Sequence, residues 1–182
     1  MKLVLCLLVL LVLVAPAYAD YTNSPEAKFA SGDGNIAYLT VGALVPFVED
    51  GRNANPHGIR TLDALGTSVL LEQALKLIVR EPRPDTGSRN SFPSGHTTAA
   101  FAIAAMESNY HPDQAPIWYT GASLIGVSRI VLDRHWVHDV VAGAGLGYLT
   151  ARWELQNSHG LMLSPFIAPG SRAVGMEGCI NF

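Results

Sequence analysis

The sequence predicts an all-α protein, a compact bundle of about five helices with a short C-terminal β-hairpin. Two features of the sequence favour this fold. Apolar residues recur at helical spacing in several stretches, and short polar segments rich in Pro and Gly separate those stretches. The chain has 182 residues, of which 49% are apolar and 15% charged. This composition is sufficient for one hydrophobic core and too apolar for a disordered chain.

The expected helices follow one another along the chain with short connections. They cover residues 35–48, 59–80, 95–109, 115–132 and 137–155. In the second of them, Leu62, Leu65 and Val69 follow a helical period, and Pro82 stops the helix. The tail 160–182 has two apolar segments around Pro169-Gly170, which favours a hairpin.

Three glycines, Gly143, Gly145 and Gly147, lie inside the last expected helix. No strand precedes them, so they do not form a dinucleotide-binding loop. We expect them to allow close packing of this helix against a neighbour.

The N-terminal segment has the layout of a secretory signal peptide. Lys2 precedes an apolar run over 3–14, and Ala17-Tyr18-Ala19 offers a cleavage site. The apolar run is short for a membrane span, which needs about 20 residues. We therefore expect residues 1–19 to be removed and the product to be periplasmic or otherwise extracytoplasmic. An integral membrane protein with its site facing outward is the alternative.

The remaining chain divides into a polar arm at 20–34, a helical domain at 35–159 and a tail at 160–182. The formal net charge is −3, and removal of Lys2 makes it more negative by one. This charge argues against a nucleic-acid-binding protein, which would present a basic face. Cys6 lies in the signal segment, so Cys179 has no partner for an internal disulfide in the mature monomer.

Three short stretches carry candidate chemistry. In the first, Lys76 lies near a helix end and Arg83 stands between two prolines. In the second, Ser94-Gly95-His96 begins an apolar helix, where Ser94 and the first amides favour an anion. For this second stretch alone, a capped helix with a chance histidine is the favoured interpretation.

In the third stretch, His135 and Asp139 are four residues apart. If this stretch is helical, the two share a face, and the carboxylate fixes the imidazole tautomer and leaves the other ring nitrogen free to attack. A surface ion pair at a helix start is the alternative for this pair alone.

Together the stretches supply the groups that phosphoryl transfer needs. Lys76, Arg83 and Arg129 can bind phosphate oxygens, and the arginines can do so through two bonds each. One histidine can attack while the other serves as the acid. No carboxylate cluster for two divalent metals is evident in the sequence, so the cations would stabilise the developing charge.

The sequence resembles the type 2 phosphatidic acid phosphatases, which share an active site with bacterial class A acid phosphatases and vanadium haloperoxidases. The family signature, K-x6-RP, PSGH and SR-x5-H-x3-D, matches at 76–84, 93–96 and 128–139. The segment between the first two blocks, 85–92, is shorter than in most relatives. The resemblance implies the helical fold of this superfamily.

By this resemblance, His135 attacks phosphorus, Asp139 orients His135, and His96 protonates the leaving oxygen and then activates water. The phosphate-binding residues would be Lys76, Arg83, Ser94, Gly95 and Arg129. No cofactor or metal is implied, and vanadate is expected to inhibit. The substrate would be a phosphorylated lipid or a small phosphate ester, with possible peripheral membrane contact; the oligomeric state is not determined.

Three alternatives stay open at this point. The same pocket could hold vanadate in a haloperoxidase, or the scaffold could bind phospholipid without turnover. A zinc site formed by His135, His138 and Asp139 is the third.

Overall fold

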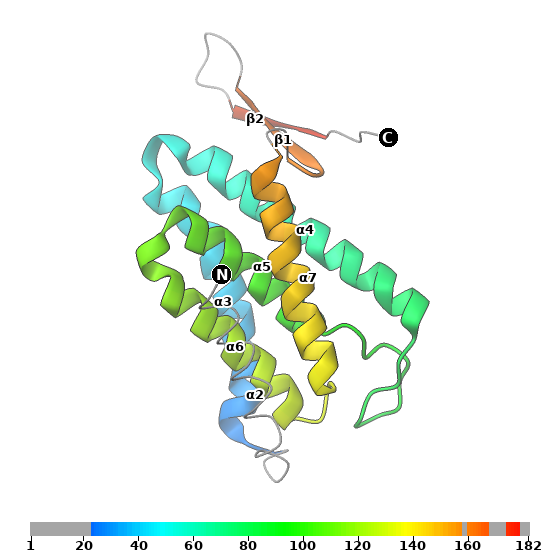
Figure 1. The fold of residues 1–182 in the computed structure, drawn as a ribbon. Helices are drawn as coiled ribbons and strands as arrows, with labels where there is room; N and C mark the ends of the chain where they lie inside the picture. Colours follow the sequence, from blue (N-terminus) through cyan, green and yellow to red (C-terminus); the bar gives the residue numbers. More distant parts are fainter. Residues whose placement is uncertain (1–22, 158–159, 168–173, 179–182) are drawn as a thin grey trace.

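The computed structural model describes residues 23–157, 160–167 and 174–178. The expected signal peptide lies outside these residues. The chain forms a helical bundle followed by two short strands (Figure 1). The longer helices are α3 (Asp33–Glu49), α4 (Ala54–Val79), α5 (Gly95–Tyr110), α6 (Ala115–Val131) and α7 (Val137–Gln156). The shorter elements are α2 (Pro25–Ser31) and two 3-10 turns, η2 (Gly51–Asn53) and η3 (Pro112–Gln114).

Helix α5 is the centre of the bundle. It contacts α3, α4, α6 and α7, and every residue from Thr97 to Glu107 is buried. A helix that is buried on all sides needs an apolar surface all round, and five alanines allow its neighbours to approach closely. Phe101 and Ile103 pack with Trp118 and Tyr119 of α6 in the main hydrophobic cluster.

Two of the three glycines in α7 bring this helix against α5. A Cβ atom at Gly143 would lie 2.6 Å from the carbonyl oxygen of Ser94, and one at Gly147 would overlap the carbonyl of Thr98. The expectation of close packing is therefore confirmed for these two positions. It is wrong for Gly145, where a Cβ would meet nothing within 4 Å.

The polar arm expected at 20–34 contains a helix, α2. Ser24 caps this helix, since its side chain accepts a hydrogen bond from the Ala27 amide at 3.0 Å. Pro25 occupies the first turn. Although the segment is polar, Ser24-Pro25-Glu26 is a typical helix start. Helix α2 packs against α6 and thereby reaches the end of the bundle that carries the candidate site.

The predicted boundaries of the five longer helices agree with the structure to within two residues, except at the start of α4. That helix begins at Ala54, five residues earlier than predicted, because Pro56 is tolerated in a first helical turn. At its end Arg80 adopts a left-handed conformation, with φ of 52°. In the tail, β1 (Leu163–Ile167) and β2 (Val174–Gly178) pair antiparallel, with Leu163 opposite Gly178.

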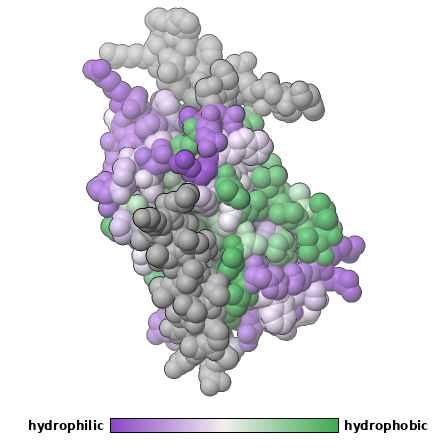
Figure 2. Space-filling model, viewed as in Figure 1, coloured by the Kyte–Doolittle hydropathy of each residue, from purple (hydrophilic) through white to green (hydrophobic). Residues whose placement is uncertain are grey.

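No helix in the described part of the chain combines the length and apolar character that crossing a membrane requires. Apolar side chains are nevertheless exposed on several helices, among them α3, α4, α6 and α7. Figure 2 shows apolar residues gathered over the right half of one face, where α4 and α7 run in Figure 1. The exposed apolar side chains of these two helices include Leu70, Leu77, Ile78, Leu149 and Trp153.

Candidate active site

The three predicted blocks meet at one end of the bundle, where α4 and α6 end and α5 and α7 begin (Figure 1). A backbone hydrogen bond of 3.0 Å from the Ser94 amide to the Asp139 carbonyl joins the second block to the third. The electrostatic environment shows the same convergence. The charges of Lys76, Arg83 and Arg129, one from each of three separate elements, all act on the His96 ring.

His135 and Asp139 form a buried pair. His135 Nδ1 lies 3.4 Å from Asp139 Oδ2, and their side chains are almost completely excluded from solvent. We expected the two residues to share a helix face if the stretch 135–139 were helical. They do not, because α7 begins between them, at Val137. Trp136 is the N-cap, and its backbone N–H donates a 2.9 Å hydrogen bond to Asp139 Oδ2. The capping geometry of α7 therefore turns the carboxylate toward the imidazole.

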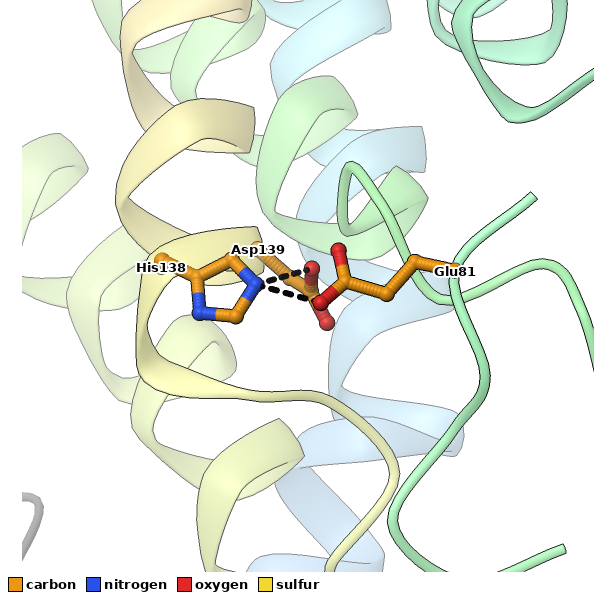
Figure 3. A group of neighbouring side chains, drawn as sticks. All are labelled: Glu81, His138 and Asp139. Carbon is orange, nitrogen blue, oxygen red and sulfur yellow. Dashed lines mark hydrogen bonds and ion pairs between the residues drawn. The ribbon is translucent and has the colours of Figure 1, made fainter. Parts of the chain in front are cut away.

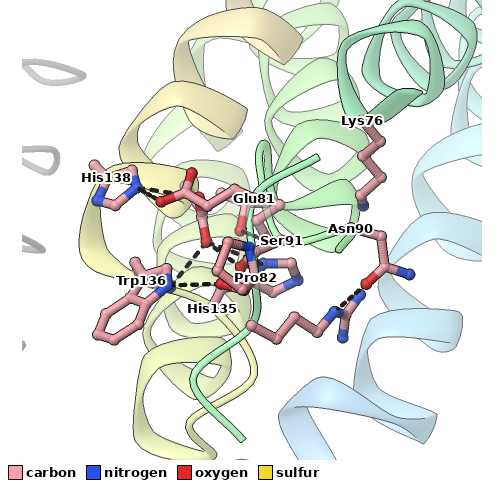
Figure 4. Close-up of polar contacts among 12 residues, drawn as sticks. Lys76, Glu81, Pro82, Asn90, Ser91, His135, Trp136 and His138 are labelled. Carbon is pink, nitrogen blue, oxygen red and sulfur yellow. Dashed lines mark hydrogen bonds and ion pairs between the residues drawn. The ribbon is translucent and has the colours of Figure 1, made fainter. Parts of the chain in front are cut away.

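Ser91 completes this pair and was not predicted. Its hydroxyl donates a 2.5 Å hydrogen bond to Asp139 Oδ2 and lies 3.4 Å from His135 Nδ1 (Figure 4). Its own amide donates to the Glu81 carbonyl at 2.9 Å, which fixes the loop against α7. Ser91 lies just ahead of the second block, but nothing in its spacing pointed to this contact.

Asp139 is held in its ionised form. Burial by itself raises the pKa of the Asp139 carboxyl, but hydrogen bonds from His135, Ser91 and the Trp136 amide outweigh burial and place the pKa below its ordinary value. A carboxylate with these donors is a fixed negative charge beside the imidazole.

His135 is suited to be a nucleophile. Burial lowers its pKa; Asp139 opposes that shift, whereas the charges of Arg129 and Arg83 reinforce it. The ring is therefore neutral at pH 7. With Nδ1 turned toward Asp139, the lone pair of Nε2 is available for bond formation.

His96, the second residue of α5, is less buried than His135. Burial and, after it, the charges of Arg129, His135, Lys76 and Arg83 lower the pKa of His96 to about 4. His96 is thus neutral at pH 7 without substrate. A bound phosphate would offset the neighbouring cations and raise the pKa of His96, so the ring could carry a proton when substrate is present.

Ser94 and Gly95 lie at the start of α5, as predicted. Ser94 occupies the N-cap position and is fully buried, but its side chain caps no backbone amide. Its hydroxyl instead accepts a 3.0 Å hydrogen bond from Thr97. At Gly95, a Cβ atom would lie 2.8 Å from Oε1 of Glu72. Glu72 therefore leaves no space for a side chain larger than hydrogen at position 95.

Lys76 is paired with a buried acid that the sequence did not identify as part of the site. Its ammonium donates to Glu72 Oε1, one helical turn back along α4, and the Glu72 side chain is only 2% exposed. A buried carboxylate requires such a partner. Glu72 thus fixes Lys76 near the first turn of α5.

The two arginines are held by polar side chains. Arg83 Nε donates to Asn90 Oδ1 at 2.7 Å, within the loop between α4 and α5 (Figure 4). Arg129 donates through Nη1 to the Ser31 hydroxyl at the end of α2. Arg129 Nε is buried and has no hydrogen-bond partner in the described part of the chain, so it is a donor available to an anion.

Arg129 keeps its charge although it is buried. Burial and, after it, the nearby charges of Arg83 and Arg134 lower its pKa to about 10, which leaves it protonated at pH 7. Arg134 points elsewhere and forms an exposed ion pair with Asp85 at 2.7 Å.

The zinc-binding set considered from the sequence is not the set that the fold brings together. His135 approaches Oδ2 of Asp139, whereas His138 lies near Oδ1. Among the described residues, the group of three with metal-ligand spacing is Glu81, His138 and Asp139 (Figure 3). His135 is not part of it.

Comparisons with known proteins identify the family to which the chain is similar. The model of the PAP2 superfamily matches residues 59–162. The chain is 39% identical over 143 residues to the lipid A 1-phosphatase of Porphyromonas gingivalis, covering 70% of this chain and 32% of that protein. It is 34% identical over 84 residues to an acid phosphatase of Zymomonas mobilis, covering 46% of this chain and 30% of that protein. The matches thus span about a third of the length of these two relatives.

A solved structure supports the fold assignment. The crystal structure of LpxE from Aquifex aeolicus aligns with a TM-score of 0.57 and 26% identity. The alignment covers 72% of this chain and 82% of that chain.

Proposed function

Because the chain belongs to the PAP2 superfamily, we propose that it is an exported, metal-independent phosphatase. In this proposal it hydrolyses a lipid phosphate or lipid pyrophosphate through a phosphohistidine intermediate. The observation that carries the proposal is the buried His135 imidazole. It is neutral at pH 7, held beside an ionised carboxylate, and close to the charges of Arg129 and Arg83.

In the first step, Nε2 of His135 forms a bond to phosphorus while the bond from phosphorus to the leaving oxygen breaks. His96 gives its proton to that oxygen. Asp139 stabilises the positive charge that develops on His135. Lys76, Arg83 and Arg129 bind the equatorial oxygens, and the amides at the start of α5 add donors.

In the second step, the neutral His96 takes a proton from water. The resulting hydroxide attacks the phosphohistidine, the phosphorus–nitrogen bond breaks, and inorganic phosphate leaves. His135 returns to its neutral form. The same two histidines therefore serve both halves of the reaction.

A lipid substrate is favoured by two observations. The relative with the highest identity given above is a lipid A 1-phosphatase, and this chain has a largely apolar cavity of about 620 Å³ between α2, α3 and α6. Ser128 and Val131, on either side of Arg129 in α6, line this cavity. An acyl chain could occupy it while the phosphate binds at Arg129. The exposed apolar residues of α4 and α7 would suit contact with a membrane surface.

Trapping the intermediate tests the mechanism. Acid quenching of the wild type during turnover of a labelled substrate should give acid-labile, base-stable phosphate on the protein. His135→Ala should give none. His96→Ala should accumulate more label when the leaving group needs no protonation, because this variant lacks the base for the second step. Label on serine would refute the mechanism and point to Ser94.

Export is tested separately. Mass spectrometry of the exported protein should show Asp20 as its first residue. An intact N-terminus in the membrane fraction would contradict cleavage.

A further inference from the structure

The two oxygens of Asp139 have different surroundings. Oδ2 accepts hydrogen bonds from Ser91 and the Trp136 amide and faces His135. Oδ1 is buried and has no hydrogen-bond partner among the described residues. An ionised carboxylate oxygen without a donor is unfavourable in a buried site. Oδ1 is therefore an acceptor that a ligand could satisfy.

Two more ligand atoms lie beside this oxygen. His138 Nε2 is 3.4 Å from Asp139 Oδ1, without hydrogen-bond geometry, and 2.8 Å from Glu81 Oε1. All three ligand atoms lie within 4.8 Å of one another, and Figure 3 shows one nitrogen of the His138 ring facing both carboxylates. The His138 side chain is 58% exposed and that of Glu81 25%, so the group can be reached from solvent.

We propose that Glu81, His138 and Asp139 bind one divalent transition-metal ion and that its binding inhibits the enzyme. One imidazole nitrogen and two carboxylate oxygens, with water as a fourth ligand, suit Zn²⁺ in particular. The site lies outside the phosphate-binding residues, so it does not replace them.

Inhibition follows from the shared carboxylate. An ion bound at Oδ1 withdraws negative charge from Asp139, and the same carboxylate supports the positive charge that develops on His135 during attack. The ion therefore weakens the nucleophile without touching the substrate. This part of the inference rests on the proposed function, whereas metal binding does not.

Direct binding is the first test. Zn²⁺ is titrated into chelator-treated protein by calorimetry, and Co²⁺ absorption in the visible range reports the ligand geometry. We expect one ion per chain. His138→Ala and Glu81→Gln should each weaken binding about tenfold or more.

The matched control is His111→Ala. This histidine lies at the other end of α5, 3.2 Å from Asp50, so it is a histidine beside a carboxylate outside the proposed site. Its substitution should leave the affinity unchanged. Absence of binding to the wild type, or loss of binding in His111→Ala but not in His138→Ala, would overturn the proposal.

Activity is the second test. Saturating Zn²⁺ should lower kcat of the wild type about tenfold, as a shift of one unit in the basicity of His135 would. His138→Ala should show the wild-type rate without metal and resist Zn²⁺. Stoichiometric binding with unchanged rate would overturn inhibition. An enzyme that is inactive without metal would instead refute the proposed metal-independent reaction, while leaving the binding site intact.

Discussion

The Trp136 amide donates a hydrogen bond of 2.9 Å to Asp139 Oδ2, the oxygen that faces His135 Nδ1. The start of helix α7 and the orientation of the proposed nucleophile thus depend on one carboxylate oxygen. This oxygen also accepts from Ser91 at 2.5 Å. A substitution that keeps an oxygen at this position but removes its charge should therefore separate the chemistry from helix capping.

Asp139→Asn should lower kcat on the order of 10²–10⁴-fold, because an amide cannot stabilise the imidazolium or fix the tautomer of His135. The amide oxygen can still accept from Trp136, so the cap is kept and the melting temperature should change little. Steady-state kinetics and thermal unfolding measure the two effects. A large loss of stability with nearly normal kcat would show that Asp139 serves only the helix.

Ser91→Ala should lower kcat roughly tenfold or more, because it removes a hydrogen bond to a charged group. The pKa of Asp139 should rise toward its ordinary value, so the acid limb of the pH–rate profile moves to higher pH. Ser123→Ala is the control, since the buried Ser123 hydroxyl has no partner in the described part of the chain. Equal effects of the two substitutions would contradict the assignment of Ser91.

Gly95→Ala should raise KM about tenfold and lower kcat by a smaller factor. The new Cβ would lie 2.8 Å from Glu72 Oε1 and would displace Glu72 together with its partner Lys76. Gly145→Ala is the matched control in α7, where a Cβ meets nothing within 4 Å. It should keep activity and slightly stabilise the helix. Unchanged KM in Gly95→Ala would show that Lys76 does not bind the phosphate.

Glu107→Gln should change how stability depends on pH. Glu107 is buried without a hydrogen bond for either oxygen in the described part of the chain, and burial followed by the charge of Asp50 raises its pKa from 4.5 to about 8. The folded state thus holds a proton that the unfolded state loses, and stability falls as pH rises from 4.5 to 8. The variant should match the wild type at pH 5 and exceed it by about 1–3 kcal/mol at pH 8.

Thermal or urea unfolding of both proteins at the two pH values checks this difference. Both proteins share the titration of His96, so the comparison isolates Glu107. A variant that is less stable than the wild type at pH 8 would mean that the Glu107 carboxylate is favourably paired.

Activity should survive EDTA, because the proposed reaction uses Lys76, Arg83 and Arg129 for charge stabilisation.

Vanadate should inhibit competitively, as a five-coordinate mimic of the transition state. Arg129→Lys should not restore function, because an ammonium lacks the planar two-point contact of a guanidinium. Inhibition assays and kinetics measure all three effects. Loss of activity on chelation that zinc restores would contradict the mechanism.

The sequence by itself determined the five longer helices and the placing of the three blocks. Helical boundaries follow from apolar period, caps and prolines, which are local properties. The number of residues from Lys76 to Arg83, and from Ser128 to Asp139, is likewise a property of the linear sequence. A sequence signature could therefore identify both stretches. The short helix α2 was not predicted, because the polar composition of residues 20–34 indicates a segment without regular structure. The Ser-Pro-Glu sequence at 24–26 is nevertheless a typical helix start.

Only the tertiary structure decided which side chains support those residues. Ser91 contacts Asp139 where the segment ahead of α5 packs against α7, and Ser31 contacts Arg129 where α2 packs against α6. No local pattern marks such partners, because a hydrogen bond between distant segments depends on how their backbones approach. Gly143 and Gly147 permit the closest of these approaches, and through it the Ser94 amide meets Asp139. Burial, which sets the pKa values of both histidines, is likewise a property of the assembled bundle.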